Sequence, residues 1–176
     1  MKKRFVCALL ALVLLVGLVP VTAAAADNKV SEAAVTVLKQ MTPIKLDTKN
    51  MTHCYHVIGK EFRIGYGTVC EERHSFDKNG KPKAKGNDHT MTQLQADKAL
   101  RAALGTLDTK INSFASKNGL SLSQNQHDAL VVFTYGAGDA WLSGTGALKS
   151  AIVSKAGANE LLNVMKNLND GQFSRH

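Results

Sequence analysis

The chain has 176 residues and a formal net charge of +8 at pH 7. This length suits one domain with its own hydrophobic core, and the positive charge suits a partner with fixed negative charge. Nucleic acid is not the partner that we expect, because the cations are scattered and no ladder of aromatic residues lies between them. A lysine-rich run at residues 78–85 also contains Asn79, Gly80 and Pro82, which predicts a solvated loop.

The first 26 residues have the pattern of a secretory signal peptide. Three cations at residues 2–4 precede an apolar run at residues 5–19, and the small residues Ala24, Ala25 and Ala26 stand directly before Asp27. The apolar run is shorter than the roughly 20 residues that a membrane-spanning helix needs, so we expect no stable membrane anchor after cleavage. The sequence therefore predicts an exported protein whose single domain comprises residues 27–176, with a net charge of +5 once the three leading cations are removed.

Residues 28–41 are predicted to form the first helix of this domain. Apolar residues recur at helical spacing from Val30 to Met41, Asn28 or Ser31 can cap the helix, and Glu32 suits the first helical turn. Pro43 disfavours helical geometry at the residue before it, so we expect the helix to stop at Thr42.

The following segment, residues 44–90, is polar, rich in turn residues, and contains a predicted β-hairpin. Residues 55–58 and 61–69 have the composition of two strands around Gly59 and Lys60. Gly65 and Gly67 flank Tyr66 and indicate a close approach of the backbone near a bend.

Cys54 and Cys70 lie just outside the two ends of this hairpin. An even pair of cysteines in an exported chain predicts a disulfide, which would contribute about 3 kcal/mol by restricting the unfolded chain. The alternative is a zinc site that adds His53, His56 and His74, but exported cysteine pairs oxidise more often than they bind metal.

From Thr92 onward the chain is predicted to be helical. Two long helices open with the capping-box patterns Thr92-x-x-Gln95 and Ser123-x-x-Gln126. Gly119 and the segment Gly136-Ala137-Gly138 predict their ends. The remaining prediction is a loop at residues 139–146, which contains Trp141, followed by shorter helices at residues 147–154 and 158–168.

The block Leu-Ser-Gln-Asn-Gln-His-Asp-Ala-Leu-Val-Val-Phe at residues 122–133, taken with Ile64-Gly65-Tyr66-Gly67, resembles the phage-type lysozymes of glycoside hydrolase family 24. The resemblance extends over about residues 30–165. It implies an α+β, mainly α lysozyme-like fold with a small β-hairpin lobe and a helical lobe. It also implies a monomer that acts on the glycan strands of peptidoglycan without a cofactor or metal, secreted or associated with the cell wall.

Members of this family hydrolyse the β-1,4 bond between N-acetylmuramic acid and N-acetylglucosamine. One carboxylic acid protonates the leaving oxygen, and polar groups on the hairpin position the attacking water. Alignment of the first helix and the hairpin places Thr42 on the acid position, His56 at or beside the usual Asp, and Arg63 on the usual Thr or Ser. A threonine hydroxyl does not titrate near neutrality, so it cannot replace a carboxyl whose pKa is raised for this purpose.

Two other carboxylates are candidate replacement acids. Asp47 lies five residues after Thr42, and Glu61 stands beside Phe62, an aromatic neighbour that favours a raised pKa by desolvation. The simpler interpretation makes Asp47 a loop carboxylate and Glu61 an outward-facing strand residue. Tyr66 and Trp141 are the predicted glycan-binding aromatic residues.

Three functional hypotheses follow from these residues. The first is a bacteriolytic, antimicrobial hydrolase that uses a replacement acid, and the second is a catalytically inactive protein that still binds the cell wall. The third is the small secreted zinc-binding domain. The polar tail after Met165 lacks helical periodicity and is shorter than the family pattern, so the resemblance also implies a domain that is truncated at its C-terminus.

Overall fold

The computed structural model describes residues 28–58, 61–70 and 89–155, with residues 157, 160, 161, 163 and 164. The predicted signal peptide, the lysine-rich run, the polar tail and part of the predicted helix at residues 158–168 lie outside the described residues. The fold is α+β and mainly α, as predicted. In the described part of the chain, no helix is both long and apolar enough to cross a membrane.

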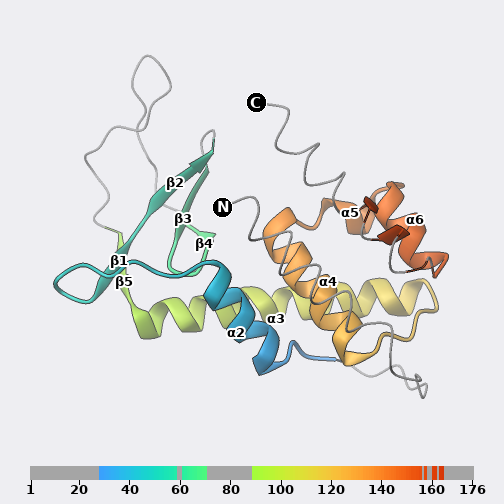
Figure 1. The fold of residues 1–176 in the computed structure, drawn as a ribbon, viewed down its shortest axis with the longest axis horizontal. Helices are drawn as coiled ribbons and strands as arrows, with labels where there is room; N and C mark the ends of the chain where they lie inside the picture. Colours follow the sequence, from blue (N-terminus) through green and yellow to red (C-terminus); the bar gives the residue numbers. More distant parts are fainter. Residues whose placement is uncertain are drawn as a thin grey trace, which may run out of the picture. The chain divides into compact units, whose positions relative to one another are not determined.

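The chain divides into two compact units, one of residues 38–103 and one of residues 1–37 with 104–176. The described strands all lie in the first of these units (Figure 1). β1 (Met51–His53) pairs antiparallel with β5 (Thr90–Thr92). β2 (Tyr55–Ile58), β3 (Glu61–Ile64) and β4 (Thr68–Val69) form an antiparallel sheet in the order β2-β3-β4.

The prediction of one continuous strand at residues 61–69 was wrong. A turn at residues 65–67 separates β3 from β4, and it contains Gly65 and Gly67 with φ angles of 58° and 94°. Side chains other than glycine rarely adopt such positive φ angles. The two glycines that the sequence placed at a bend therefore reverse the chain and create a third strand.

The turn packs closely on α3 (Gln93–Lys117). A Cβ atom added to Gly65 would lie 2.8 Å from the Cβ of Ala96, a separation that real Cβ atoms essentially never show. Ala96 is fully buried in the first turn of α3, which begins after the capping box formed by Thr92 and Gln95. Glycine at position 65 is therefore required both for its φ angle and for its lack of a side chain.

The predicted disulfide between Cys54 and Cys70 is confirmed. It joins the residue before β2 to the residue after β4, and the half-buried Cys54 packs with Met91 against a small buried cluster of Phe62, Ile64 and Cys70. The bridge therefore fixes both ends of the three-stranded sheet on one hydrophobic cluster.

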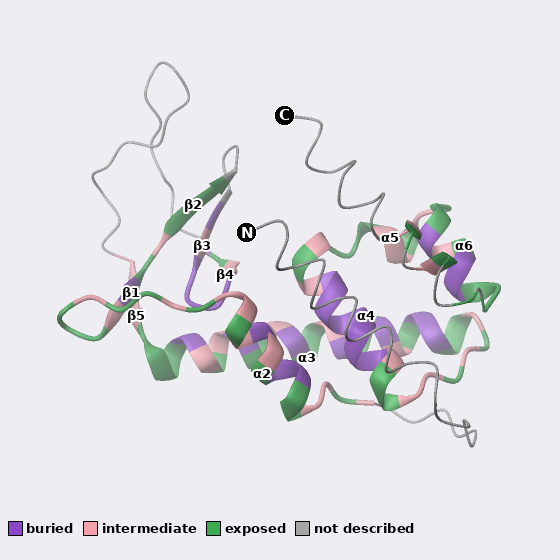
Figure 2. Ribbon diagram, viewed as in Figure 1, coloured by how far each residue is buried: buried purple, intermediate pink, exposed green. Residues whose placement is uncertain are grey.

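The second unit is helical and contains α4 (Gln124–Ala137), α5 (Ala140–Ser143) and α6 (Ala147–Val153). The capping box at Ser123 and the end of α4 before Gly138 are confirmed. Eight successive residues of α4, His127–Thr134, are buried, so the middle of this helix is covered around its whole circumference (Figure 2).

Two helix boundaries differ from the prediction. The expected loop at residues 139–146 contains the short helix α5, in which Trp141 packs edge-on against Phe114 at 5.3 Å between ring centroids. The first helix, α2 (Glu32–Met41), begins after Ser31 and not at residue 28, and the Ser31 hydroxyl caps it by accepting from the N–H of Ala34 at 3.2 Å. The backbone N–H of Val30 donates to Asp108 at 3.0 Å and that of Ser31 donates to Asp128 at 2.9 Å, so this segment is bound to side chains instead of forming a helical turn.

Candidate active site

Thr42 occupies the end of α2, one residue beyond the last helical residue, as Pro43 predicted. Its hydroxyl oxygen lies 2.8 Å from the carbonyl oxygen of Leu38 and 3.1 Å from that of Tyr66, and it donates its proton to these two acceptors. The side chain therefore joins the end of α2 to the turn between β3 and β4. It has no group that could give up a proton to a leaving oxygen near neutral pH.

Asp47 organises the loop that leads from α2 to β1. One carboxylate oxygen accepts hydrogen bonds from the backbone N–H groups of Lys49 and Met51 at 2.8 and 2.9 Å, and the other lies 2.8 Å from Nε2 of His53. The hydrogen bond from the Met51 amide, followed by that from His53, lowers the pKa of Asp47 to about 2. Asp47 is therefore ionised at neutral pH and fixed in a structural role.

The hairpin places His56 and Arg63 on neighbouring strands. His56 is paired with Phe62, and their ring centroids are 5.2 Å apart. Arg63 is paired with Tyr55 on one side and with Val69 on the other, and it donates a hydrogen bond of 2.9 Å to the carbonyl oxygen of Gly67. Neither side chain is a carboxylate or a hydroxyl, the kinds of group that position water in the lysozyme mechanism.

Glu61 lies on β3, where its backbone is paired with Ile58. The orientation of its side chain lies outside what the structure describes. Glu61 thus stays a prediction as a replacement acid.

Tyr66 lies in the turn after β3 and is buried, with 6% of its surface exposed. The Nζ atom of Lys39 lies 5.4 Å from the centroid of its ring, within the range of a cation–π contact. A ring with so little exposed surface is positioned to hold the turn against α2 and offers little area on which a sugar could stack.

Residues 49–173 match the phage lysozyme family. This range covers more than half of the 176 residues. The chain belongs to the phage lysozyme family. No curated protein and no solved structure matches the chain. Membership of the family supports a lysozyme-like function directed at peptidoglycan. The matched range begins after α2, so the correspondence of Thr42 to the family's acid rests on the alignment of that helix.

A second carboxylate of this unit, Asp97, was not predicted from the sequence. Asp97 on α3 forms ion pairs with Lys39 on α2 and, at 3.0 Å, with Arg101. The hydrogen bond from Lys39, followed by that from Arg101, lowers the pKa of Asp97. The i, i+4 spacing of Asp97 and Arg101 is visible in the sequence, whereas the contact with Lys39 spans 58 residues and is not.

The described carboxylate side chains of residues 38–103 are therefore Asp47 and Asp97. Both have a lowered pKa, whereas the general acid of a lysozyme needs a raised one.

Trp141, the second predicted glycan-binding residue, belongs to the helical unit. It is half-buried, its Nε1–H donates to the Thr134 hydroxyl at 3.2 Å, and its ring packs edge-on against Phe114 and Phe133. These contacts give Trp141 a structural role within its own unit and leave part of its surface accessible.

The zinc hypothesis loses two of its five ligands. Cys54 and Cys70 are joined in the disulfide, and a disulfide sulfur is not the thiolate that binds zinc. Among the described residues no group of three or more His, Cys, Asp or Glu side chains is placed to hold a metal ion. Of the three predicted ligands that remain, His53, His56 and His74, the last lies outside the described residues.

Proposed function

We propose that this member of the phage lysozyme family binds peptidoglycan and does not hydrolyse it. The observation that carries the proposal is the hydroxyl of Thr42, which is bound to the Leu38 and Tyr66 carbonyl oxygens. The alignment of the first helix assigns this residue to the position of the family's acid. The proposal includes export of the protein, since the first 26 residues have the pattern of a signal peptide.

The electrostatics of the described carboxylates supports the same conclusion. Cleavage of a glycosidic bond needs a group that is protonated in the ground state and ionised in the transition state. Asp47 and Asp97 are held in the ionised form by amide, histidine, lysine and arginine donors. Neither carboxyl can therefore supply the missing proton near neutral pH.

Two assays on purified peptidoglycan test the proposal. In a sedimentation assay the protein is expected to pellet with the insoluble wall. In a reducing-end assay, with an active phage lysozyme as positive control, the same preparation is expected to release no new reducing ends. Reducing ends that appear with the native protein and disappear in Glu61→Gln would assign the acid to Glu61 and overturn the proposal.

The variant Thr42→Glu restores a carboxyl at the acid position. It leaves His56 and Arg63 at the two hairpin positions, so the group that positions water is still absent. We expect this variant to stay inactive. A variant that also carries His56→Asp and Arg63→Thr has the family's residue types at all three positions, and it tests whether they restore hydrolysis together.

A further inference from the structure

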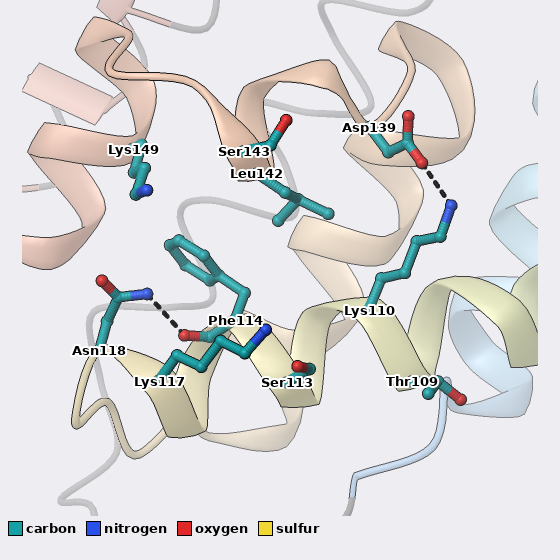
Figure 3. A pocket seen from close by; sticks show the side chains of 10 residues that line it. All are labelled: Thr109, Lys110, Ser113, Phe114, Lys117, Asn118, Asp139, Leu142, Ser143 and Lys149. Atoms are coloured by element: carbon teal, nitrogen blue, oxygen red, sulfur yellow. Dashed lines mark hydrogen bonds and ion pairs between the residues drawn. The ribbon is translucent and has the colours of Figure 1, made fainter.

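A cavity of about 580 Å³ opens among α3, α5 and α6 of the helical unit (Figure 3). This volume lies within the range of small-ligand sites, roughly 300 to 1,000 Å³. None of Thr42, Asp47, His56, Glu61 and Arg63 lines it. The residues that line the cavity are therefore different from the candidate active-site residues.

Three lysines and one carboxylate give the lining of the cavity a net positive charge. Lys110 on α3 donates a hydrogen bond of 2.5 Å to Asp139, and this bond is the main cause of the lowered pKa of Asp139. The charges of Lys110 and Asp139 therefore cancel at one side of the cavity. Within the described residues Lys117 and Lys149 have no ion-pair partner, so they contribute an uncompensated charge of +2.

The two uncompensated lysines come from different helices and lie on either side of the Phe114 ring (Figure 3). Phe114 is buried and packs edge-on against Trp141, so the floor between the lysines is part of the hydrophobic core. Ser113 and Ser143 add hydroxyl groups to the lining. The arrangement offers two ammonium groups and hydroxyl donors around a fixed apolar floor.

We propose that this cavity binds a phosphate group of an anionic, polyol-phosphate polymer of the cell wall, an inference that rests on the wall-directed function proposed above. Lysine binds phosphate as a compact point charge, whereas bidentate recognition of a phosphate or a carboxylate needs the planar fork of an arginine. The lining contains three lysines and no arginine. The cavity is larger than one phosphate group, so it also has room for part of the adjoining polyol.

The test measures binding of a poly(glycerol phosphate) oligomer to the purified protein by calorimetry, and locates it by amide chemical shifts. The variant Lys117→Gln/Lys149→Gln removes the two uncompensated charges, and Lys45→Gln/Lys98→Gln removes two exposed lysines that do not line the cavity. We expect affinity to fall about ten-fold in the first variant and less than two-fold in the control. Shifts are expected at Phe114, Leu142 and Ser143.

Three further measurements distinguish specific binding of phosphate from general attraction of anions and from misfolding of the variants. Poly-glutamate of equal charge is expected to bind more weakly than the phosphate oligomer, and inorganic phosphate alone should compete only at high concentration. Thermal unfolding of both variants checks that they are folded. Equal losses in the two variants, or poly-glutamate bound as tightly as the phosphate oligomer, would overturn the proposal.

The cavity and the proposed function can fail independently. Peptidoglycan stripped of phosphate polymer is expected to bind the Lys117→Gln/Lys149→Gln variant as it binds the native protein. A protein that binds the stripped glycan and not the oligomer would contradict the cavity proposal alone. One that binds the oligomer and cleaves the glycan would contradict the proposed function alone.

Discussion

The hydroxyl oxygen of Thr42 lies 3.1 Å from the carbonyl oxygen of Tyr66. This contact joins the end of α2 to the turn between β3 and β4, at the position where the resemblance to phage-type lysozymes implies a catalytic carboxylic acid. Because the hydroxyl is bound to two carbonyl oxygens, Thr42 holds local structure together.

Replacing Thr42 with valine keeps the shape of the side chain and removes both hydrogen bonds. We expect the free energy of unfolding to fall by about 1 kcal/mol, measured by urea denaturation. Thr36→Val is the matched control, since its exposed hydroxyl bonds only the carbonyl oxygen four residues earlier, at Glu32. A loss at Thr42 no greater than the loss at Thr36 would mean that the contact with Tyr66 adds nothing.

Gly65→Ala is expected to be severely destabilising. The new methyl group would meet Ala96 at 2.8 Å, and alanine is strained at a φ angle of 58°. Together these effects should cost about 3 kcal/mol. In contrast, Gly105→Ala lies within α3 with no atom near the added methyl group, so it should stabilise the protein by up to about 1 kcal/mol. Thermal unfolding of both variants compares them directly, and similar melting temperatures would contradict the close packing at Gly65.

The carboxyl group of Asp47 is expected to titrate with a midpoint near 2 by carbon NMR. Because its pKa lies below the ordinary 3.8, its ionised form stabilises the loop above that pH, and the contribution disappears as the pH falls toward 2. His53→Ala should raise the midpoint and still leave it below 3.8, since the Met51 amide is the larger cause. A midpoint above 5 would make Asp47 a credible general acid.

Asp108 is expected to show the opposite dependence on pH. Burial raises its pKa above the ordinary 3.8, so the folded protein holds this proton more tightly than the unfolded chain. The contribution of Asp108 to stability therefore falls as the pH rises above 3.8. Asp108→Asn keeps an oxygen that can accept the hydrogen bond from Val30 and removes the buried charge.

The test compares the unfolding free energy of the native protein and of Asp108→Asn across pH 3 to 7. Relative to the variant, the native protein should lose stability as the pH rises. Asp139→Asn is the matched control. Because Lys110 lowers the pKa of Asp139, the native protein should gain stability relative to this variant as the pH rises. Parallel profiles for the native protein and Asp108→Asn would contradict the burial of a proton at Asp108.

Local sequence patterns predicted much of the fold because their physical causes are local. The two capping boxes each need only residues three positions apart, and Pro43 ends α2 by acting on its immediate neighbour. The β1–β5 pair was not predicted, since it joins two three-residue strands that lie 36 residues apart and have little periodicity of their own. The helix at Trp141 also escaped prediction, because its packing against Phe114 and Phe133 is a tertiary contact.

The candidate site, like the fold, was predictable only where its causes lie in the local sequence. The sequence located Thr42 through Pro43 and the family pattern, and it located the disulfide through the number of cysteines. It could not predict that Asp47 is held by Met51 and His53, or that Tyr66 is buried beneath Lys39, because those properties depend on how the loop and the turn fold back.

The release of reducing ends from purified peptidoglycan tests the central claim most directly. The native protein, incubated with walls at neutral pH beside an active phage lysozyme, is expected to bind the walls and to give the same reducing-end signal as the buffer. A signal that grows with time and with protein concentration would contradict the account, because it would mean that a proton donor other than Thr42 serves the glycosidic oxygen.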